Sequence, residues 1–134
     1  MWRIEFTSDQ FLPALPEECQ GNPGVYGFEL AWWLCQALAQ AGIVTSYPLG
    51  EDWGWLIEYI APSGIEFTIG CGSMAEEGEG YLEVPIQWSI FVRPHASLKQ
   101  RLRGVSNDEE VQSLGKVILA ALHGKGIGPV LSAD

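Results

Sequence analysis

The residues best placed for chemistry lie in one run, Glu51-Asp52-Trp53-Gly54-Trp55, where two carboxylates precede two tryptophans. General acid–base catalysis would need the carboxylates to face each other in a pocket that shifts their pKa values. Adjacent carboxylates in a turn usually point apart into solvent, and Asp commonly caps a turn. We therefore interpret Glu51 and Asp52 as turn residues and the tryptophans as core, with catalysis as the alternative.

Cys71 lies in a second suggestive run, Gly70-Cys71-Gly72-Ser73. A cysteine nucleophile requires a histidine partner and a positive field that favours the thiolate. The glycine spacing matches no nucleotide-binding motif, and nearby glutamates would repel a phosphate. With Cys19 and Cys35 there is no Cys-x-x-Cys pair, and the histidines are scattered, so we predict unpaired thiols, no metal site and no cofactor.

One helix is predicted to organise the fold, because the segment Asn22–Gly42 has complete start and stop signals. Asn22 is suited to cap the helix, Pro23 to occupy its first position, and Gly42 to end it. A helical projection at about 100° per residue places small and apolar residues on one side, which we predict to be buried. These residues are Gly27, Leu30, Ala31, Leu34, Leu38 and Ala41.

The opposite side of this helix carries Trp33 among polar side chains, with Tyr26 and Trp32 on its flanks. An aromatic cluster with a polar rim has the composition of a protein-interaction hot spot. The predicted binding residues are Tyr26, Trp32, Trp33, Glu51 and Asp52. The alternative is that another segment, such as the proline-rich loop 11–20, covers Trp33 and buries it as a second small core.

The other segments predict the fold class. Alternating or β-branched residues indicate strands at 2–7, 43–47, 53–60, 65–71 and 81–92, with a weaker one at 127–131. Residues 72–80 read as an acidic loop, 93–105 as helix or coil, and 108–123 as a second helix capped by Asn107. Short turns between consecutive strands favour antiparallel pairing. We predict one α+β domain over 1–134, a two-layer sandwich with a mostly antiparallel four- to five-stranded sheet and two helices packed on one face.

The charge balance restricts the partners. Seven basic residues against 17 acidic ones give a formal net charge of −10. Nucleic acid and anionic lipid would repel such a chain, so we predict neither as a partner. The locally basic stretch 93–103 is interpreted as a solvated face. No apolar run approaches the roughly 18 residues of a membrane span, and the first residues lack a signal-peptide pattern, so the predicted location is the cytoplasm.

The chain resembles small uncharacterised bacterial proteins that share an Asn-Pro-Gly-x-Tyr-Gly helix start and a Glu-Asp-Trp-Gly-Trp strand motif. The residues that carry the resemblance are Asn22-Pro23-Gly24, Tyr26-Gly27, Leu30-Ala31, Leu34, Glu51-Asp52-Trp53-Gly54-Trp55 and Gly70-Cys71-Gly72. The resemblance covers roughly residues 22–72 and implies no named activity. In size and charge the chain is also similar to immunity proteins that neutralise a toxin, a likeness without a matching motif.

These patterns favour a non-enzymatic acidic domain that binds another protein, either a basic partner such as a toxin or a second copy of itself. The alternative is a small hydrolase or ligand-binding domain that uses Glu51, Asp52 or Cys71 in a pocket by the sheet. A closed pocket with converging carboxylates would favour the alternative, whereas exposed tryptophan on a flat surface would favour the binding domain.

Overall fold

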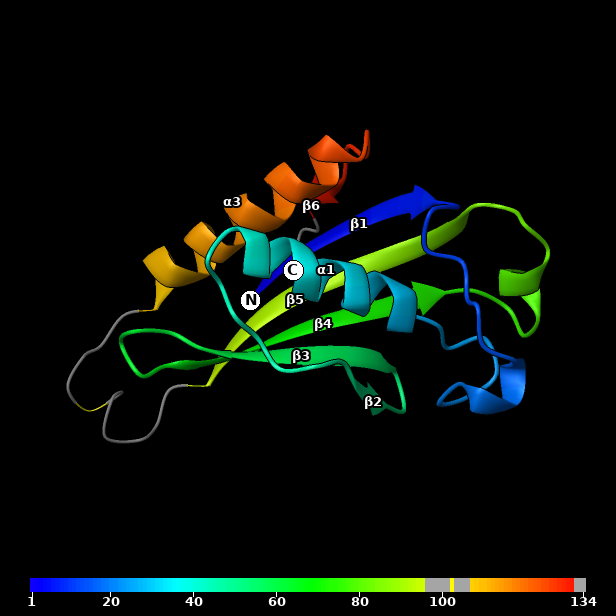
Figure 1. Ribbon diagram of the computed structural model, residues 1–134, viewed down its shortest axis with the longest axis horizontal. Helices are drawn as coiled ribbons and strands as arrows, with labels where there is room; N and C mark the ends of the chain where they lie inside the picture. Colours follow the sequence, from blue (N-terminus) through cyan, green and yellow to red (C-terminus); the bar gives the residue numbers. More distant parts are fainter. Residues whose placement is uncertain (96–101, 103–106, 132–134) are drawn as a thin grey trace.

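The computed structural model describes residues 1–95, 102 and 107–131. In chain order, its first elements are β1 (Trp2–Ser8), the 3-10 helix η1 (Glu17–Cys19), α1 (Phe28–Gln40), β2 (Leu49–Glu51), β3 (Gly54–Ile60) and β4 (Glu66–Met74). The 3-10 helix η2 (Glu79–Tyr81), β5 (Ile86–His95), α3 (Asp108–Gly124) and β6 (Val130–Leu131) follow. Figure 1 shows these elements coloured along the chain.

The strands form one antiparallel sheet in the order β2-β3-β4-β5-β1-β6 (Figure 1). The N-terminal strand β1 pairs with β5 along its whole length, from Trp2 opposite Val92 to Ser8 opposite Ile86. The α+β class and the antiparallel pairing are as predicted. The sheet has six strands instead of four or five, because two very short strands, β2 and β6, extend its edges.

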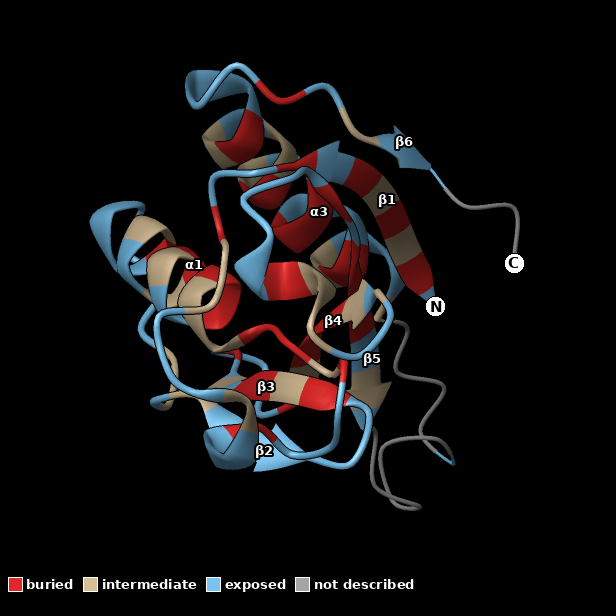
Figure 2. Cartoon of the chain, turned by 90° about the vertical axis from the view of Figure 1, so that its right-hand side faces the viewer, coloured by how far each residue is buried: buried red, intermediate tan, exposed pale blue. Residues whose placement is uncertain are grey.

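Both helices cover the same face of the sheet, as the two views in Figures 1 and 2 show. Helix α1 lies over β3 and β4, α3 lies over β5 and β1, and the helices contact each other. The buried helix residues are Leu30, Ala31, Leu34 and Leu38 of α1 and Val111, Leu114, Gly115, Ile118 and Leu122 of α3. The predicted core side of α1 is thus confirmed, except that Ala41 is exposed at the end of the helix.

Alternate strand residues point into the layer between the sheet and the helices, and this layer is the core. Its fully buried strand residues include Ile4, Ile57, Ile69, Cys71, Trp88, Ile90 and Val92. Removing this apolar surface from water is the main force that holds the two layers together. The residues between them point to the other side, which we call the open face because no described helix covers it. None of the described helices is both long and apolar enough to cross a bilayer.

Helix α1 begins later than predicted, at Phe28. Gly24 and Gly27 have φ values of 77° and 147°, which are not helical. A Cβ at Gly27 would lie 2.7 Å from a carbonyl oxygen of β4, so a glycine there lets the chain approach the sheet closely. Asn22 does not cap the helix, and its side-chain amide donates to the Asp52 carbonyl at 3.0 Å. The prediction was wrong because Asn-Pro-Gly suits a turn as well as a cap.

The strand predicted at 43–47 is also wrong. This segment runs beside β3, where the Ser46 N–H donates to the Glu58 carbonyl at 2.9 Å and Ser46 Oγ accepts from the Glu58 N–H at 2.9 Å. Because one of these bonds uses a side chain, no regular ladder forms. The edge strand is β2, Leu49–Glu51, and it includes Glu51, which was interpreted as a turn residue.

Strand β5 begins at Ile86 and not at residue 81. The preceding residues form η2 and a turn in which Glu83 has a φ of 58°, a backbone conformation that a strand does not allow. Strand β4 continues to Met74, which shortens the predicted acidic loop. Residues 93–95 extend β5, whereas 96–101 and 103–105 of the ambiguous segment lie outside the described residues.

The predicted second helix and the weak C-terminal strand are confirmed. Helix α3 runs from Asp108 to Gly124. Asn107 occupies its N-cap position as predicted, but its side chain makes no capping hydrogen bond. Strand β6 pairs with β1, with Val130 opposite Glu5 and Leu131 opposite Ile4.

Candidate functional site

Three loop segments meet at the right-hand side of the molecule in Figure 1: residues 13–27, 49–53 and 75–85, which we call the loop end. Ser73 at the end of β4 anchors the first segment, because its Oγ donates to the Gly24 carbonyl and accepts from the Tyr26 N–H, both at 2.9 Å. The Asn22 side chain joins the same segment to the 49–53 turn. Segments far apart in sequence therefore form one surface.

Tyr26 is fully buried beneath the loop end. Its hydroxyl donates to Glu17 Oε2 at 3.0 Å and accepts from the N–H groups of Gly78 at 3.1 Å and Gly80 at 3.4 Å. Glu17 Oε1 in turn accepts from the Gly24 N–H at 2.8 Å. Burial raises the pKa of Tyr26, so the hydroxyl stays protonated. Tyr26 thus holds the loops together and is not the exposed binding residue that was predicted.

A second tyrosine fastens η2 to the segment around η1. The Tyr81 hydroxyl donates to the Leu15 carbonyl. The Gln20 side-chain amide donates to the same carbonyl and to the Tyr81 hydroxyl, both at 3.4 Å. The Tyr81 ring meets the Tyr26 ring edge-on with 5.8 Å between centroids. These contacts make the loop end a packed unit.

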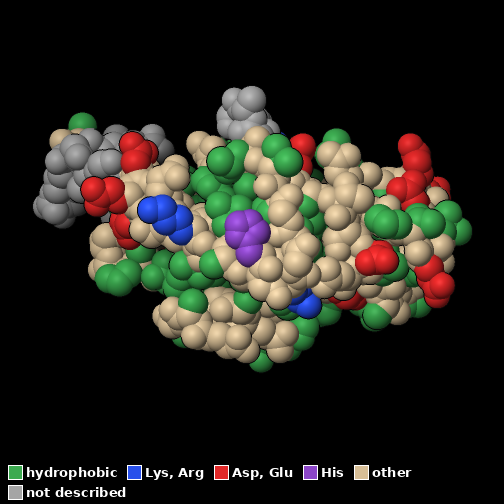
Figure 3. Space-filling view, turned by 90° about the horizontal axis from the view of Figure 1, so that it is seen from above, with side chains coloured by type: hydrophobic (Ala, Val, Ile, Leu, Met, Phe, Trp, Pro, Cys, Tyr) green, Lys and Arg blue, Asp and Glu red, His purple; other side chains and the backbone are tan. Residues whose placement is uncertain are grey.

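The loop end is strongly acidic. Its three segments hold eight of the 17 acidic residues and no Lys or Arg. The acidic residues are Glu17, Glu18, Glu51, Asp52, Glu76, Glu77, Glu79 and Glu83. Figure 3 shows acidic side chains gathered at this end, on the right of the view from above. Such a concentration of one sign creates a field that attracts positively charged partners.

Exposed apolar side chains lie among these carboxylates. Leu82 is 67% exposed, Val84 41%, Leu15 40% and Tyr81 38%. Because the Tyr81 hydroxyl bonds the Leu15 backbone, these residues come from two segments that touch. Acidic and apolar surface are therefore combined at the loop end.

Trp32 is the exposed aromatic residue of α1. Its ring stacks on Tyr47 with 5.6 Å between centroids and 9° between planes. Trp32 is 37% and Tyr47 is 73% exposed. Only Pro48 separates Tyr47 from β2. The same chain continues to Glu51 and Asp52, which are both exposed at the β2–β3 turn.

Trp33 lies on a different surface from Trp32, since successive helix residues differ by about 100° in direction. Its ring centroid is 5.2 Å from that of the buried Phe11, and the Lys125 ammonium lies 5.5 Å above the ring. Trp33 is only partly exposed. The alternative in which the segment beginning at Phe11 covers Trp33 is therefore the one that the structure supports.

The cysteines are all unpaired. Cys71 is fully buried, and burial raises the pKa of its thiol far above the usual value, which opposes the thiolate that a nucleophile requires. Cys19 is exposed and Cys35 is partly buried. Within the described residues, no three His, Cys, Asp or Glu side chains are grouped so that they could hold a metal ion.

A polar cluster on the open face was missed by sequence reasoning. Thr68 Oγ1 and His95 Nε2 are 2.8 Å apart. In the register of the sheet, Glu66 lies opposite His95 and Glu58 lies opposite Thr68. The hydroxyl–imidazole contact is exposed to solvent. Finding this cluster requires the strand register, which the single sequence did not reveal.

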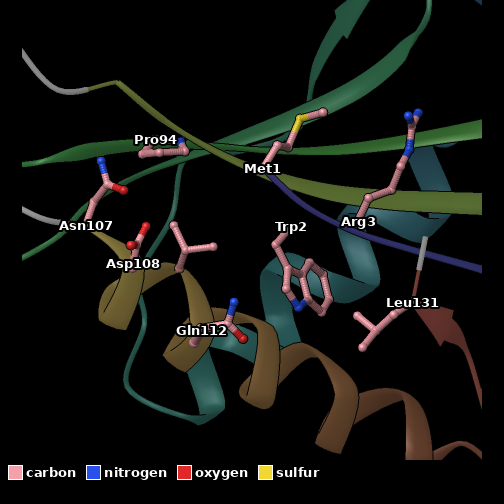
Figure 4. A pocket seen from close by; sticks show the side chains of 9 residues that line it. Met1, Trp2, Arg3, Pro94, Asn107, Asp108, Gln112 and Leu131 are labelled. Atoms are coloured by element: carbon pink, nitrogen blue, oxygen red, sulfur yellow. The ribbon is translucent and has the colours of Figure 1, made fainter. Parts of the chain in front are cut away.

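A hollow of about 410 Å³ lies between the start of β1 and the start of α3 (Figure 4). In the close-up, Trp2 points toward α3 and Arg3 points to the opposite side of the strand. A Cβ at Gly115 of α3 would lie 2.5 Å from the Trp2 indole nitrogen, so the helix packs closely on Trp2.

Comparison with known proteins adds no relative: no family model matches the chain, and neither a curated protein nor a solved structure is significantly similar to it.

Proposed function

We propose that the protein is a non-enzymatic binding domain whose loop end docks onto a basic protein. The observation that carries this proposal is the set of eight carboxylates in three touching segments without any Lys or Arg. Complementary charge of this kind speeds the encounter with a positively charged partner and disfavours other partners.

The exposed apolar residues supply the second requirement of a protein interface. Interfaces bury an apolar centre and keep polar groups at the rim. Leu82, Val84 and Leu15 provide apolar contact surface, and the surrounding carboxylates would form the rim. The stacked rings of Trp32 and Tyr47 would enlarge the contact surface beside Glu51 and Asp52.

The network around Tyr26 favours the same proposal. Ordering loops on binding reduces affinity, and the bonds from Tyr26 and Glu17 to Gly24, Gly78 and Gly80 order these loops in the free protein. The loop end of a second copy would carry the same negative charge, so we favour a different, basic protein over self-association. An immunity-like role toward a basic toxin is one form of this proposal.

The test is affinity capture from the native host with wild-type protein and two charge-reversed variants. Glu76→Lys/Glu77→Lys changes the loop end, whereas Glu66→Lys/Glu109→Lys reverses the same number of exposed carboxylates elsewhere. A specific partner should be captured by the wild type and by the control variant but be lost with the loop-end variant. Thermal unfolding of each variant checks that the fold is retained.

The captured protein is then purified and its affinity is measured at several salt concentrations. We expect Kd to rise with salt, because screening weakens attraction between exposed charges. Equal binding by both charge-reversed variants, or a partner with a net negative charge, would contradict the proposed docking surface.

A further inference from the structure

A groove of about 430 Å³ crosses the open face of the sheet, and it is independent of the docking proposal for the loop end. Its floor and walls include Gly72 and Met74 of β4, Ser89, Phe91 and Arg93 of β5, and Trp53 before β3. A volume of roughly 300 to 1,000 Å³ is typical of sites for small molecules.

The floor of the groove carries a polar group, the Ser89 hydroxyl. Ser89 is only 8% exposed, but its oxygen is not among the buried side-chain atoms of the described residues that lack a hydrogen-bond partner. The hydroxyl is therefore placed to bond water or a ligand in the groove. Gly72 lies opposite Ser89 in the sheet, and a Cβ at Gly72 would meet only the Trp53 carbonyl at 3.3 Å and Ser89 Oγ at 3.7 Å. The missing side chain leaves room above the serine.

The walls are flat and apolar. The rings of Trp53 and Phe91 are 5.2 Å apart. The Phe91 ring lies over Gly70, where a Cβ would come within 2.2 Å of it. Trp53 and Met74 remain 42% and 59% exposed. A planar apolar group placed beside Trp53 would therefore remove apolar surface from water.

One end of the groove is positively charged. The Arg93 guanidinium lies 5.1 Å from the centre of the Phe91 ring, and Arg93 forms no ion pair or hydrogen bond with another described residue. Arg3 also lines this groove. Glu5 lies opposite Ser89 on β1, so a negative ligand group would avoid that side and turn toward Arg93. A guanidinium binds the two oxygens of a carboxylate particularly well.

We propose that this groove binds a small carboxylate with a flat apolar body. The carboxylate accepts hydrogen bonds from Arg93, the body lies against Trp53 and Met74, and the Ser89 hydroxyl bonds a polar atom of the ligand. Phenylacetate carries both required groups and is a suitable probe.

The test is titration of the ¹⁵N-labelled full chain with phenylacetate, followed by NMR. We expect saturable shifts of the Ser89, Gly72 and Phe91 amides and the Trp53 indole N–H, with a Kd of about 1 mM or below. Arg93→Gln should weaken binding at least about tenfold, since it removes the charge-assisted hydrogen bonds to the carboxylate. Ser89→Ala should change the Kd of phenylacetate less than about twofold, since this probe has no polar atom besides its carboxylate.

Lys116→Gln is the matched control, because Lys116 is exposed on α3 and its loss changes the net charge by the same amount. This variant should alter Kd less than about twofold. The spectrum of each free variant shows whether it is folded. The proposal would be overturned by an equal loss of affinity in Arg93→Gln and Lys116→Gln, or by chemical shifts that do not saturate. Tighter binding of benzylamine than of phenylacetate would also overturn it. Shifts of the same residues caused by raising the protein concentration alone would also overturn it, in favour of self-association.

Discussion

At the scale of single residues, the Tyr26 hydroxyl is the most heavily used side-chain group of the loop end. Tyr26→Phe would leave the N–H groups of Gly78 and Gly80 and the Glu17 carboxylate without this partner. Because buried groups without hydrogen bonds are costly, we expect the free energy of unfolding to fall by about 1–3 kcal/mol. Urea unfolding measures the change.

Tyr47→Phe is the control for this variant. Tyr47 is 73% exposed and touches Trp32 through its ring, so removing its hydroxyl should change the free energy of unfolding by less than about 0.5 kcal/mol. If both variants lost the same stability, the network around Tyr26 would not be what holds the loops.

The adjacent tryptophans of α1 provide a second prediction. Trp33 packs on Phe11 beneath Lys125, whereas Trp32 is stacked on an exposed tyrosine. Trp33→Glu should therefore lower the free energy of unfolding by about 2 kcal/mol or more, since it places a charge in a partly apolar site. Trp32→Glu should cost clearly less. Equal Tm values for the two variants would show that Trp33 is not part of the packed structure.

At the scale of elements, the centre of the sheet depends on a glycine. A Cβ at Gly70 would lie 2.2 Å from the Phe91 ring and 2.8 Å from the Trp53 ring, whereas a Cβ at Gly72 meets nothing closer than 3.3 Å. Gly70→Ala should lower the free energy of unfolding by about 1–3 kcal/mol, as overpacking does, and more than Gly72→Ala. Both are measured by thermal unfolding.

A double-mutant cycle tests the cause. Phe91→Ala removes the ring that the new methyl group would meet, so Gly70→Ala should cost less in the Phe91→Ala background than in the wild type. An unchanged cost would mean that the destabilisation arises from the backbone and not from the aromatic ring.

The elements also show what the sequence could predict. Periodicity identified α3, the buried stripe of α1, β1 and the β3–β4 hairpin, because each buries one regular face. The errors lie at 22–27, 43–47 and 81–85. There the alternation or capping pattern is present, but contacts with distant segments decide the backbone: Gly27 against β4, Ser46 against Glu58, and η2 against Tyr26.

At the scale of the whole molecule, charge is distributed unevenly. The net charge is −10, and the loop end holds eight carboxylates and no Lys or Arg. Their mutual repulsion is screened as the Debye length falls from about 30 Å at 0.01 M salt to about 8 Å at 0.15 M. We therefore expect the free energy of unfolding to rise over this range, measured by urea unfolding in NaCl.

Glu76→Gln/Glu77→Gln should stabilise the protein at low salt and reduce its salt dependence, because two of the repelling charges are removed. Lys116→Gln, which makes the net charge more negative, should do neither. A fall in stability on adding salt would indicate that attractive charge pairs outweigh the repulsion.

The candidate site was only partly predictable from sequence. The acidic runs at 76–79 and 51–52 are visible in the sequence, and Trp32 was identified from its place on α1. That Glu17, Asp52 and Glu83 belong to one surface depends on loops meeting through Tyr26 and Asn22. These contacts join residues far apart in the chain, and no local sequence pattern predicts them. The same holds for the groove, whose Ser89 and Gly72 become neighbours through strand pairing.

The Tyr26–Glu17 pair has a consequence for motion. The amide protons of Gly24 and of Gly78 and Gly80 belong to two loops far apart in sequence, yet all three are held by this one pair. Opening the pair should release them together, so their hydrogen-exchange rates should converge on one value and rise together in Tyr26→Phe. Loops coupled in this way open as a single cooperative unit, and a partner that binds the loop end should slow the exchange of all three amides by the same factor.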